Sequence, residues 1–349
     1  MIKALHVTGF WSGNYYYRCY LPAIANGWYV SNDFIDGGGE NDGYALVNKI
    51  DKSEVVLFQR PNSKTLVQLM ELAKQKNKIV VFDDDDTFKI GEGIVPVGEY
   101  EEKKAQEIDA NRTRALKIAH GAICTTEFLA KELRQFNNNV IVIQNCIDPE
   151  DEGDVLPNTT DKPRILILGS VVSNDDWHIA KKAIMQVADR VTFVLMGVPK
   201  DGEEGAYSED MAFWNSLPNV EKIGFTPFGD YYNTIIDTAV DIAIAPRKDN
   251  YFNRCKSNLK FLEVSLFGIP FIGQAFSDGL SPYQVNPEDK DYLILAQTEQ
   301  DWCDILEEVA DNPSKFKEIG QKAKEYVLKE YDINKHAYKY VEFYKSILN

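Results

Sequence analysis

The sequence predicts an α/β protein with two successive, doubly wound parallel sheets that are each covered by helices. Short apolar runs at residues 55–58 and 79–82 alternate with amphipathic stretches, and the same alternation resumes from residue 165. Continuous apolar runs are typical of parallel strands covered on both faces, and the helices between them supply the crossover connections. Residues 149–163 separate the two blocks and are acidic, with proline and glycine but few large apolar groups. This linker-like composition indicates two Rossmann-like domains.

The length of the chain agrees with this division. The 349 residues are enough for two domains that each bury a core. We expect an N-terminal domain at residues 1–150, a linker at 151–163, a C-terminal domain at 164–328 and a final helical segment at 329–349.

Charge and cysteine usage exclude several classes of protein. The formal net charge of −16 disfavours loose binding to nucleic acid or to anionic lipid. The five cysteines are scattered without a Cys-x-x-Cys pair, so they indicate neither a zinc site nor a disulfide framework, and a reduced, cytoplasmic setting fits best. The apolar start of the chain is too short for a signal peptide, and no apolar run reaches the length of a membrane span.

The N-terminal half alternates strands and helices in the order that this fold requires. A glycine-bearing loop ending at Gly13 lies between the first strand and a first helix that is interrupted by Pro22. Glycine at this place often lets a ligand approach the backbone, so Gly13 is a candidate contact. The predicted elements are strand 4–7, helix 15–25, strand 55–58, helix 65–74, strand 79–82, a mixed-charge helix at 99–119, a strand within 120–126, helix 128–136 and strand 140–143.

Four consecutive aspartates, residues 83–86, follow directly after one of these strands. Ligands of doubly wound sheets bind beyond the carboxyl ends of the strands, so the first interpretation is an acidic group of a ligand site. Adjacent carboxylates would raise the pKa of one member, which suits a shared proton or contact with a hydroxyl group. A solvated loop that caps the next helix is the second interpretation. A site for a hard divalent cation is the third.

In the C-terminal half, the loops that follow strands carry the candidate ligand contacts. Gly169 and Ser170 follow strand 165–168 and could approach phosphates, and Arg247 follows strand 241–245 and could supply a further phosphate contact. Phe225 offers an aromatic face that suits a nucleobase, although core packing would explain it equally well. The other predicted elements are helix 176–188, strand 191–196, strand-like residues 220–223, strand 271–273 and helices 298–310, 315–328 and 331–348.

Residues 253–270 are the most informative stretch of the sequence. Their pattern predicts a short loop followed by a helix that ends abruptly. Ser257 or Asn258 can cap the start of the helix through a side-chain oxygen. Gly268 suits the position just after the last turn, and Pro270 prevents continuation.

This helix combines an apolar stripe with charged groups that fit a nucleotide. The stripe consists of Leu259, Leu262 and Leu266. Glu263 falls on the same face, where a carboxylate is costly unless it has a partner. Arg254 and Lys256 lie just before the helix, and cations at a helix start suit a diphosphate, while Glu263 could accept hydrogen bonds from a ribose diol. The alternative is an amphipathic helix in which Glu263 pairs with Lys260 or Lys256.

The same segment resembles the donor-binding helix of retaining GT-B glycosyltransferases of the family-4-like group, also called glycosyl transferases group 1. The shared pattern is Lys-Ser-x-Leu-Lys-x-Leu-Glu, which begins at Lys256, and then Gly-x-Pro before a hydrophobic residue. Many relatives carry Glu-x7-Glu across this segment. Here the second glutamate is Glu263, but Cys255 occupies the first position, so the glutamate that would contact the donor sugar is absent.

Two further places support the resemblance. Tyr17-Arg18 followed by Leu21-Pro22-Ala23 matches an N-terminal feature of the family, and Asp84-Asp85 with Phe88 matches its aliphatic run followed by two aspartates and an aromatic residue.

The resemblance implies a GT-B architecture, in which two Rossmann-like domains face a cleft and the final helix crosses back onto the N-terminal domain. It also implies transfer of a sugar from a nucleoside-diphosphate sugar, such as a UDP-sugar, to an acceptor hydroxyl, with retention and without a metal or other cofactor. The residues assigned to catalysis and to the acceptor are Asp84, Asp85, Arg18 and Lys256. The residues assigned to donor binding are Gly13, Gly169, Ser170, Phe225, Arg247, Arg254, Ser257, Asn258, Leu259 and Glu263.

Three alternatives remain open at this point. The acceptor could be a glycan, a small molecule or, as in phage-type enzymes, a hydroxymethylated base in DNA. The chain could instead be an inactive sugar-nucleotide binding module, because Cys255 replaces a glutamate. A metal-dependent transferase that uses residues 83–86 is the third. A homo-oligomer is possible in each case.

Overall fold

The computed structural model describes residues 2–9, 13–31, 43–87, 98–168, 176–199, 208–284 and 291–348. The chain forms two compact units, which are described separately. Unit 1 comprises Met1–Asp148, Arg254–Ser257 and Asp332–Asn349, and unit 2 comprises Pro149–Asn253 and Asn258–Tyr331. The sequence analysis places residues 254–257 in the C-terminal domain at 164–328, whereas in the structure they belong to unit 1.

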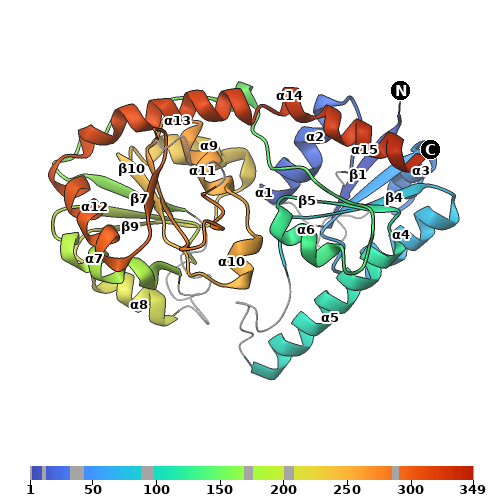
Figure 1. The fold of residues 1–349 in the computed structure, drawn as a ribbon, viewed down its shortest axis with the longest axis horizontal. Coiled ribbons are helices and arrows are strands. Elements are labelled where there is room, and N and C mark those ends of the chain that lie inside the picture. Colours follow the sequence, from blue (N-terminus) through green and yellow to red (C-terminus); the bar gives the residue numbers. More distant parts are fainter. Residues whose placement is uncertain are drawn as a thin grey trace. The chain divides into compact units, whose positions relative to one another are not determined.

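Unit 1 contains a six-stranded, fully parallel sheet in its described part (Figure 1). The strand order is β2-β1-β3-β4-β5-β6, so the direction of winding reverses between β1 and β3. The carboxyl ends of the strands beside such a reversal are where doubly wound sheets bind ligands. The strands are β1 (Ala4–Thr8), β2 (Tyr29–Val30), β3 (Val55–Gln59), β4 (Ile79–Asp84), β5 (Gly121–Cys124) and β6 (Val140–Val142).

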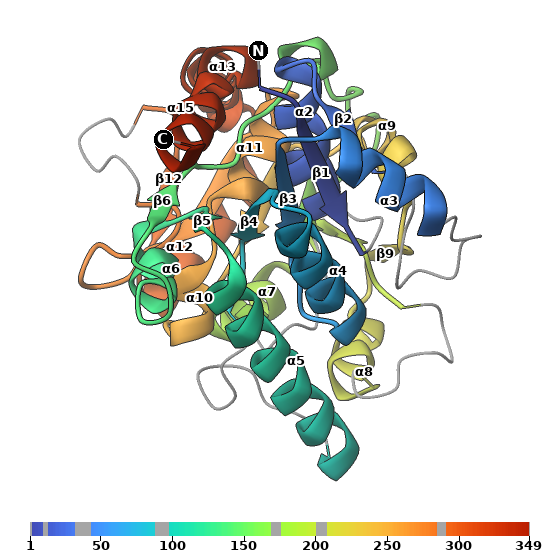
Figure 2. The same ribbon diagram turned by 90° about the vertical axis from the view of Figure 1, so that its right-hand side faces the viewer.

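Helices cover both faces of this sheet. On one face α4 and α5 pack side by side (Figure 2). Ser63 caps α4, because its side-chain oxygen accepts the Leu66 amide at 3.2 Å. The helices of unit 1 are α1 (Gly13–Tyr15), the π-helical turn η1 (Tyr16–Tyr20), α2 (Leu21–Ala25), α3 (Gly43–Lys52), α4 (Lys64–Gln75), α5 (Gly98–Ile118), α6 (Glu127–Leu133), α14 (Ile333–His336) and α15 (Tyr338–Leu348).

The last helix, α15, packs its aromatic residues on the other face of the sheet. Tyr340, Phe343 and Tyr344 join the buried cluster that includes strand residues of β1, β3, β4 and β5. His6 of β1 is fully buried there, and its Nε2 lies 2.9 Å from the Tyr344 hydroxyl. Its Nδ1 lies 3.1 Å from the carbonyl oxygen of Cys19, so Nδ1 carries the proton. Burial lowers the pKa of His6 to about 4, and the imidazole is therefore neutral at pH 7.

His6 should make the stability of the protein fall in mild acid. The unfolded chain has the ordinary histidine pKa of 6.5, so it binds this proton more tightly than the folded chain does. The unfolding free energy should therefore decrease as the pH drops from about 6.5 to about 4, by roughly 3 kcal/mol in total. Chemical denaturation of the wild type and His6→Gln at several pH values measures this, and the variant should show a shallower decrease. Equal slopes in His6→Gln and the wild type would contradict the assignment.

Unit 2 contains a second six-stranded parallel sheet in its described part, with the order β12-β11-β10-β7-β8-β9. The winding reverses between β7 and β10, as it does between β1 and β3 in unit 1. The strands are β7 (Arg164–Leu168), β8 (Thr192–Met196), β9 (Val220–Ile223), β10 (Ile242–Ala245), β11 (Phe271–Gln274) and β12 (Ile294–Ala296). The prediction of an α/β chain with two doubly wound parallel sheets is confirmed.

The helices of unit 2 pack around a core that contains Trp177, Trp214 and Trp302. The helix α12 begins with a capping box, in which Thr298 and Asp301 bond each other's backbone amides. The helices are the short η2 (Pro149–Asp151), η3 (Asp176–Ala180), α7 (Lys181–Val187), α8 (Ser208–Ser216), α9 (Phe228–Asp237), α10 (Tyr251–Cys255), α11 (Leu259–Ser265), α12 (Glu299–Asp311), η5 (Pro313–Phe316) and α13 (Lys317–Glu330). The last two residues of α10 belong to unit 1.

The stop after α11 is formed as the sequence predicts. Gly268 adopts φ +69°, a left-handed conformation that glycine takes without strain. Its carbonyl oxygen lies so close to Gly320 of α13 that a Cβ at residue 320 would meet it at 2.2 Å. Two glycines thus allow the turn and α13 to touch. Among the described helices, none combines the length and the apolar character needed to cross a membrane.

Candidate functional site

The aspartate run at the end of β4 is buried and paired with cations inside unit 1. The four residues, 83–86, are between 0% and 9% exposed. The ion pairs are Asp83–Arg18, Asp84–Arg112, Asp85–Arg60, Asp86–Arg60 and Asp86–Lys256. The interpretation as a solvated loop is therefore wrong. Within the described ranges, no group of three or more histidine, cysteine, aspartate or glutamate side chains is arranged to hold a metal ion.

All three guanidinium nitrogens of Arg18 donate hydrogen bonds within unit 1. Its Nε and Nη2 donate to the two carboxylate oxygens of Asp83 at 3.0 and 2.6 Å. Its Nη1 donates to the carbonyl oxygen of Ile143 at 2.8 Å and to Oδ1 of Asn145 at 3.3 Å. The side chain is 1% exposed, so the guanidinium group is buried. This geometry favours a role in supporting the end of β4 over direct contact with a phosphate or acceptor.

Asp84 lies on the opposite face of the sheet and belongs to a second buried network. Nε of Arg112, from α5, donates to its Oδ2 at 2.7 Å, and the backbone amides of Asp85 and Asp86 donate to its Oδ1. Arg112 also pairs with Glu132 of α6. Burial raises the pKa of Asp84 to about 6, against the opposing effect of Arg112, and the neighbouring Asp85 adds to the increase. The expected increase thus occurs, but burial is its main cause.

Arg60 joins the last two aspartates to the end of β3. It follows β3 directly and has a φ of 46°, which is a left-handed backbone conformation. Residues other than glycine rarely adopt this conformation, and those that do are often found at functional sites. Its Nε donates to Asp85 Oδ1 at 2.8 Å, and its Nη2 donates to Asp86 Oδ2 at 3.2 Å. Burial alone would raise the pKa of Asp85, but the charge and hydrogen bond of Arg60 hold it below the ordinary value. Asp85 is therefore a carboxylate at neutral pH.

The segment Arg254–Ser257 is fixed to unit 1 by three side-chain contacts. The Thr126 hydroxyl donates to the carbonyl oxygen of Cys255 at 3.0 Å, and Nδ2 of Asn145 donates to the Ser257 hydroxyl at 3.0 Å. Between these two points, Nζ of Lys256 lies 2.5 Å from Asp86 Oδ2. The Cys255 side chain is fully buried. Lys256 is therefore held at the acidic edge of the sheet, with a quarter of its side chain exposed.

In unit 2, Glu263 occupies the buried side of α11 and has a defined partner. The hydroxyl of Tyr231, from α9, donates to Glu263 Oε2 at 3.1 Å. Burial and the nearby carboxylate raise the pKa of Tyr231 well above its ordinary value, so the phenol keeps its proton and donates it. Glu263 is 7% exposed. These contacts orient a carboxylate that would otherwise be costly to bury.

Arg247 lies beyond the carboxyl end of β10 in a network of polar side chains. Its Nε donates to the Tyr283 hydroxyl at 2.8 Å, and its Nη1 donates to Asn253 Oδ1 at 2.9 Å. Asp176 accepts hydrogen bonds from Asn253 Nδ2 and from the Lys248 amide at 2.7 and 3.0 Å. Arg247 is 7% exposed, so the network holds its charge in a fixed place at the edge where this sheet is expected to bind ligands.

The start of α11 differs from the sequence-based expectation. Asn258 occupies the N-cap position, but neither it nor Ser257 caps the helix with a side chain. Asn258 Nδ2 instead donates to the Tyr331 hydroxyl at 3.0 Å, and Ser257 bonds Asn145. The prediction of a side-chain cap is wrong because both side chains find partners from distant parts of the chain. Leu259 begins the helix and is partly exposed.

The other predicted contact residues lie in loops and at helix starts. Phe225 is 73% exposed, which excludes the alternative of core packing. Gly13 is partly buried at the start of α1, and Arg254 is partly buried in unit 1. Gly169, Ser170 and Phe88 lie outside the described residues.

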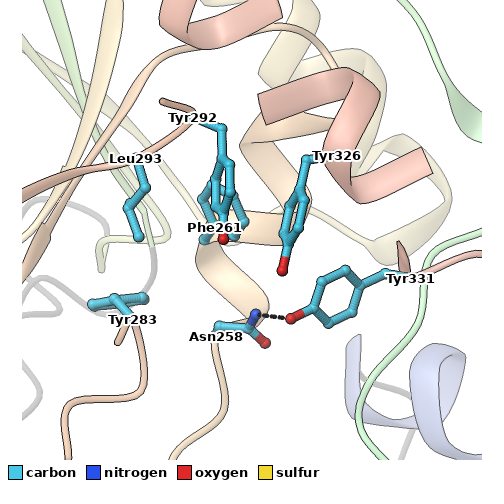
Figure 3. Close-up of a pocket in the computed structure, with 7 residues that line it drawn as sticks. All are labelled: Asn258, Phe261, Tyr283, Tyr292, Leu293, Tyr326 and Tyr331. Atoms are coloured by element: carbon cyan, nitrogen blue, oxygen red, sulfur yellow. Dashed lines mark hydrogen bonds between the residues drawn. The ribbon is translucent and has the colours of Figure 1, made fainter. Parts of the chain in front are cut away.

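A small pocket in unit 2 is lined by Asn258, at the start of α11, and by Phe261 within that helix (Figure 3). Tyr292 and Tyr326 stack along its wall with ring centroids 3.9 Å apart, and Tyr331 reaches Asn258 across its lower end. Its volume of about 10 Å³ is close to the lower limit for one water molecule. The pocket is therefore too small for a nucleotide or a sugar ring. The full lining is Asn258, Phe261, Tyr283, Tyr292, Leu293, Tyr326 and Tyr331.

Sequence reasoning missed several partners of the predicted residues. Arg60 directly follows a strand, so the rule that ligands gather at strand ends would have selected it. Arg112 lies within a long, highly charged helix, where no local pattern separates it from its neighbours. Glu132 and Tyr231 similarly occupy ordinary amphipathic positions in α6 and α9.

Comparison with solved structures identifies the architecture. HepE from Anabaena, solved in complex with UDP-glucose, superposes with a TM-score of 0.68 at 13% identity, over 99% of this chain and 100% of that one. Sucrose-phosphate synthase from Thermosynechococcus elongatus superposes with a TM-score of 0.65 at 14% identity, over 99% of both chains. A glycosyltransferase from Rickettsia africae superposes with a TM-score of 0.62 at 12% identity, over 99% of this chain and 98% of that one.

The chain has the GT-B fold. The prediction of GT-B architecture and of similarity to GT-B glycosyltransferases is confirmed. At 12–14% identity these three neighbours share the fold with the chain, and the fold alone does not define a substrate. No protein-family model matches the sequence, and no curated protein matches it.

Proposed function

We propose that this GT-B protein is a glycosyltransferase that moves a sugar from a nucleoside-diphosphate sugar to an acceptor hydroxyl. The observation that carries the proposal is the buried Glu263 carboxylate, which Tyr231 orients on α11 directly after a segment with Arg254 and Lys256. Solved GT-B neighbours contain UDP and UDP-glucose, so a UDP-sugar is the first donor to test.

In this proposal the donor is held at three points. Glu263 accepts hydrogen bonds from the ribose diol, and Phe225 stacks on the nucleobase. Arg254, Lys256 and the residues Ser257, Asn258 and Leu259 contact the diphosphate, with Arg247, Gly13, Gly169 and Ser170 as further contacts. The two side-chain cations stabilise the negative charge that develops on the leaving diphosphate, and such stabilisation is commonly the largest contribution to the rate.

The acceptor in this proposal contacts the acidic edge of unit 1. Asp85 keeps its charge because of Arg60, whereas Asp84 has a pKa of about 6. Either can orient a hydroxyl group only if it exchanges a present partner for the acceptor. Arg18 serves as a positioning residue, since its guanidinium already bonds Asp83 and Asn145.

The reaction is proposed to retain the anomeric configuration and to need no metal ion. The positive charge at the diphosphate would come from Arg254 and Lys256, which is the charge that a divalent cation supplies in other transferases. Turnover should therefore persist in excess EDTA.

A screen of nucleotide sugars tests the proposal. A donor that binds only the folded chain raises its melting temperature, and release of the nucleoside diphosphate then reports turnover. We expect a UDP-sugar to stabilise the chain and to release UDP in EDTA. Absence of stabilisation by every nucleotide sugar would refute the function.

A sugar-nucleotide binding module is the second candidate, because Cys255 stands where many relatives have a donor-contacting glutamate. The cysteine is fully buried, and burial raises the pKa of its thiol, so it remains uncharged at neutral pH. It therefore supplies no carboxylate to the site. Binding of a UDP-sugar without turnover against any acceptor would favour this candidate.

A further inference from the structure

Three buried polar atoms without a hydrogen-bond partner belong to residues at the carboxyl ends of three adjacent strands in unit 1. They are Nε2 of Gln59, Oδ1 of Asp86 and Oγ1 of Thr125. These residues are 2%, 7% and 1% exposed, and they account for half of the six such side-chain atoms in the described residues. A buried polar atom without a partner costs about 1–3 kcal/mol, so three of them at the ends of adjacent strands indicate a missing ligand or ordered water.

The topology places these atoms at the ends of three neighbouring strands. Gln59 is the last residue of β3, Asp86 follows β4 by two residues, and Thr125 follows β5 by one. In the sheet β4 lies between β3 and β5, and Gln59 is in register with Asp83. The carboxyl ends of parallel strands are the ligand-binding edge of this type of sheet.

The partners of the same side chains define which atoms remain for a ligand. The Thr8 hydroxyl donates to Oε1 of Gln59 at 2.8 Å, which leaves the NH2 group of Gln59 as a donor. Arg60 and Lys256 occupy Oδ2 of Asp86, which leaves Oδ1 as an acceptor. The Thr125 hydroxyl can both donate and accept. A donor, an acceptor and a hydroxyl are the kinds of group that form hydrogen bonds with the hydroxyl groups of a sugar or polyol.

The charge around these three residues disfavours an anionic acceptor. The paired side chains comprise five carboxylates, from residues 83–86 and Glu132, and four cations, from Arg18, Arg60, Arg112 and Lys256. One net negative charge therefore remains among these groups. An anion there would also face the Oδ1 oxygen of the Asp86 carboxylate, which accepts no hydrogen bond.

We propose that Gln59, Asp86 and Thr125 bind the hydroxyl groups of a neutral, polyhydroxylated acceptor, such as a sugar or polyol. This inference rests on the proposed sugar transfer and specifies its acceptor. It assigns the acceptor contacts to three residues with buried atoms that no described protein group pairs, in place of Asp84 and Asp85. A polyanion, whether DNA or a sugar phosphate, is the outcome that the charge argues against.

Thr125→Val is the most direct test, because it keeps the shape of the side chain and removes only the hydroxyl group. If the Thr125 hydroxyl has no ligand, its removal should leave the unfolding free energy unchanged or higher and should not change kcat/KM for the acceptor. If the hydroxyl binds the acceptor, kcat/KM for the acceptor should fall roughly 3- to 10-fold, which is the usual range for one uncharged hydrogen bond. Gln59→Met should have a similar effect.

The assay uses UDP-glucose with a panel of neutral acceptors (glucose, maltose, glycerol) and of anionic ones (glucose 6-phosphate, glucuronate, single-stranded DNA). Neutral acceptors should increase UDP release over water alone, and the two variants should reduce only that increase. Ser265→Ala is the matched control, since Ser265 also has a buried, unpartnered hydroxyl but lies in α11 of unit 2. Preference for anionic acceptors, or equal acceptor kinetics in Thr125→Val and the wild type, would overturn the inference and leave only a water site.

A binding measurement separates this inference from the proposed function. Saturation-transfer NMR detects weak binding of the same neutral compounds without turnover. If UDP-glucose does not bind but maltose binds with a dependence on Thr125, the donor proposal fails and the hydroxyl-binding site stands. If UDP-glucose binds and turns over but no neutral compound of the panel binds, the acceptor inference fails alone.

Discussion

Glu263→Ala should weaken the binding of UDP by roughly 10- to 150-fold while leaving the fold intact. The loss corresponds to one or two hydrogen bonds from a ribose diol to a charged acceptor, for which about 1.5–3 kcal/mol is typical. The helix α11 should tolerate the change, because alanine favours helix and because Tyr231 loses only one partner. Calorimetric titration with UDP measures the affinity.

Two further variants serve as comparisons for Glu263→Ala in this titration. Tyr231→Phe keeps the carboxylate and removes its orienting hydroxyl, so it should weaken UDP binding less than Glu263→Ala does. Glu325→Ala removes an exposed carboxylate from α13 of the same unit and should leave the affinity unchanged. An unaltered affinity in Glu263→Ala would remove Glu263 from the donor site.

Arg18→Met should destabilise the protein by roughly 3–5 kcal/mol, because it leaves the Asp83 carboxylate buried and unpaired. The double variant Arg18→Met with Asp83→Asn should recover much of this loss, since the remaining amide carries no charge. Arg134→Met breaks an exposed ion pair with Glu127 and should cost less than about 1 kcal/mol. Chemical denaturation of the four proteins measures these differences.

The same series also decides whether Arg18 acts in catalysis. If Arg18 only supports the end of β4, the stable double variant should retain turnover with a UDP-sugar. If Arg18 contacts a phosphate or the acceptor, the double variant should fold and yet lose activity. That second outcome would restore the role that the sequence resemblance implied for Arg18.

The fold was predictable because its signals are local. The continuous apolar runs at residues 55–58 and 79–82, within β3 and β4, are recognisable as buried parallel strands without knowledge of their neighbours. Gly268 and Pro270 likewise mark the end of α11 by their own backbone preferences. Each of these features depends on residues that are close together in the sequence.

The pairing within the candidate site was not predictable, because it joins distant residues. The aspartates at 83–86 are neutralised by arginines at positions 18, 60 and 112 and by Lys256, and no local pattern connects these positions. The failed cap at Asn258 has the same origin, since Tyr331 competes for its side chain from 73 residues away. Burial then changes the expected roles: a paired, buried arginine supports the fold, whereas an unpaired buried oxygen indicates a ligand.

A crystal structure of the full chain with UDP tests the central claim most directly. The account predicts the ribose hydroxyls within hydrogen-bond distance of the Glu263 carboxylate and the diphosphate against Arg254 and Lys256. A nucleotide bound elsewhere, with Glu263 still contacting only protein groups, would contradict it.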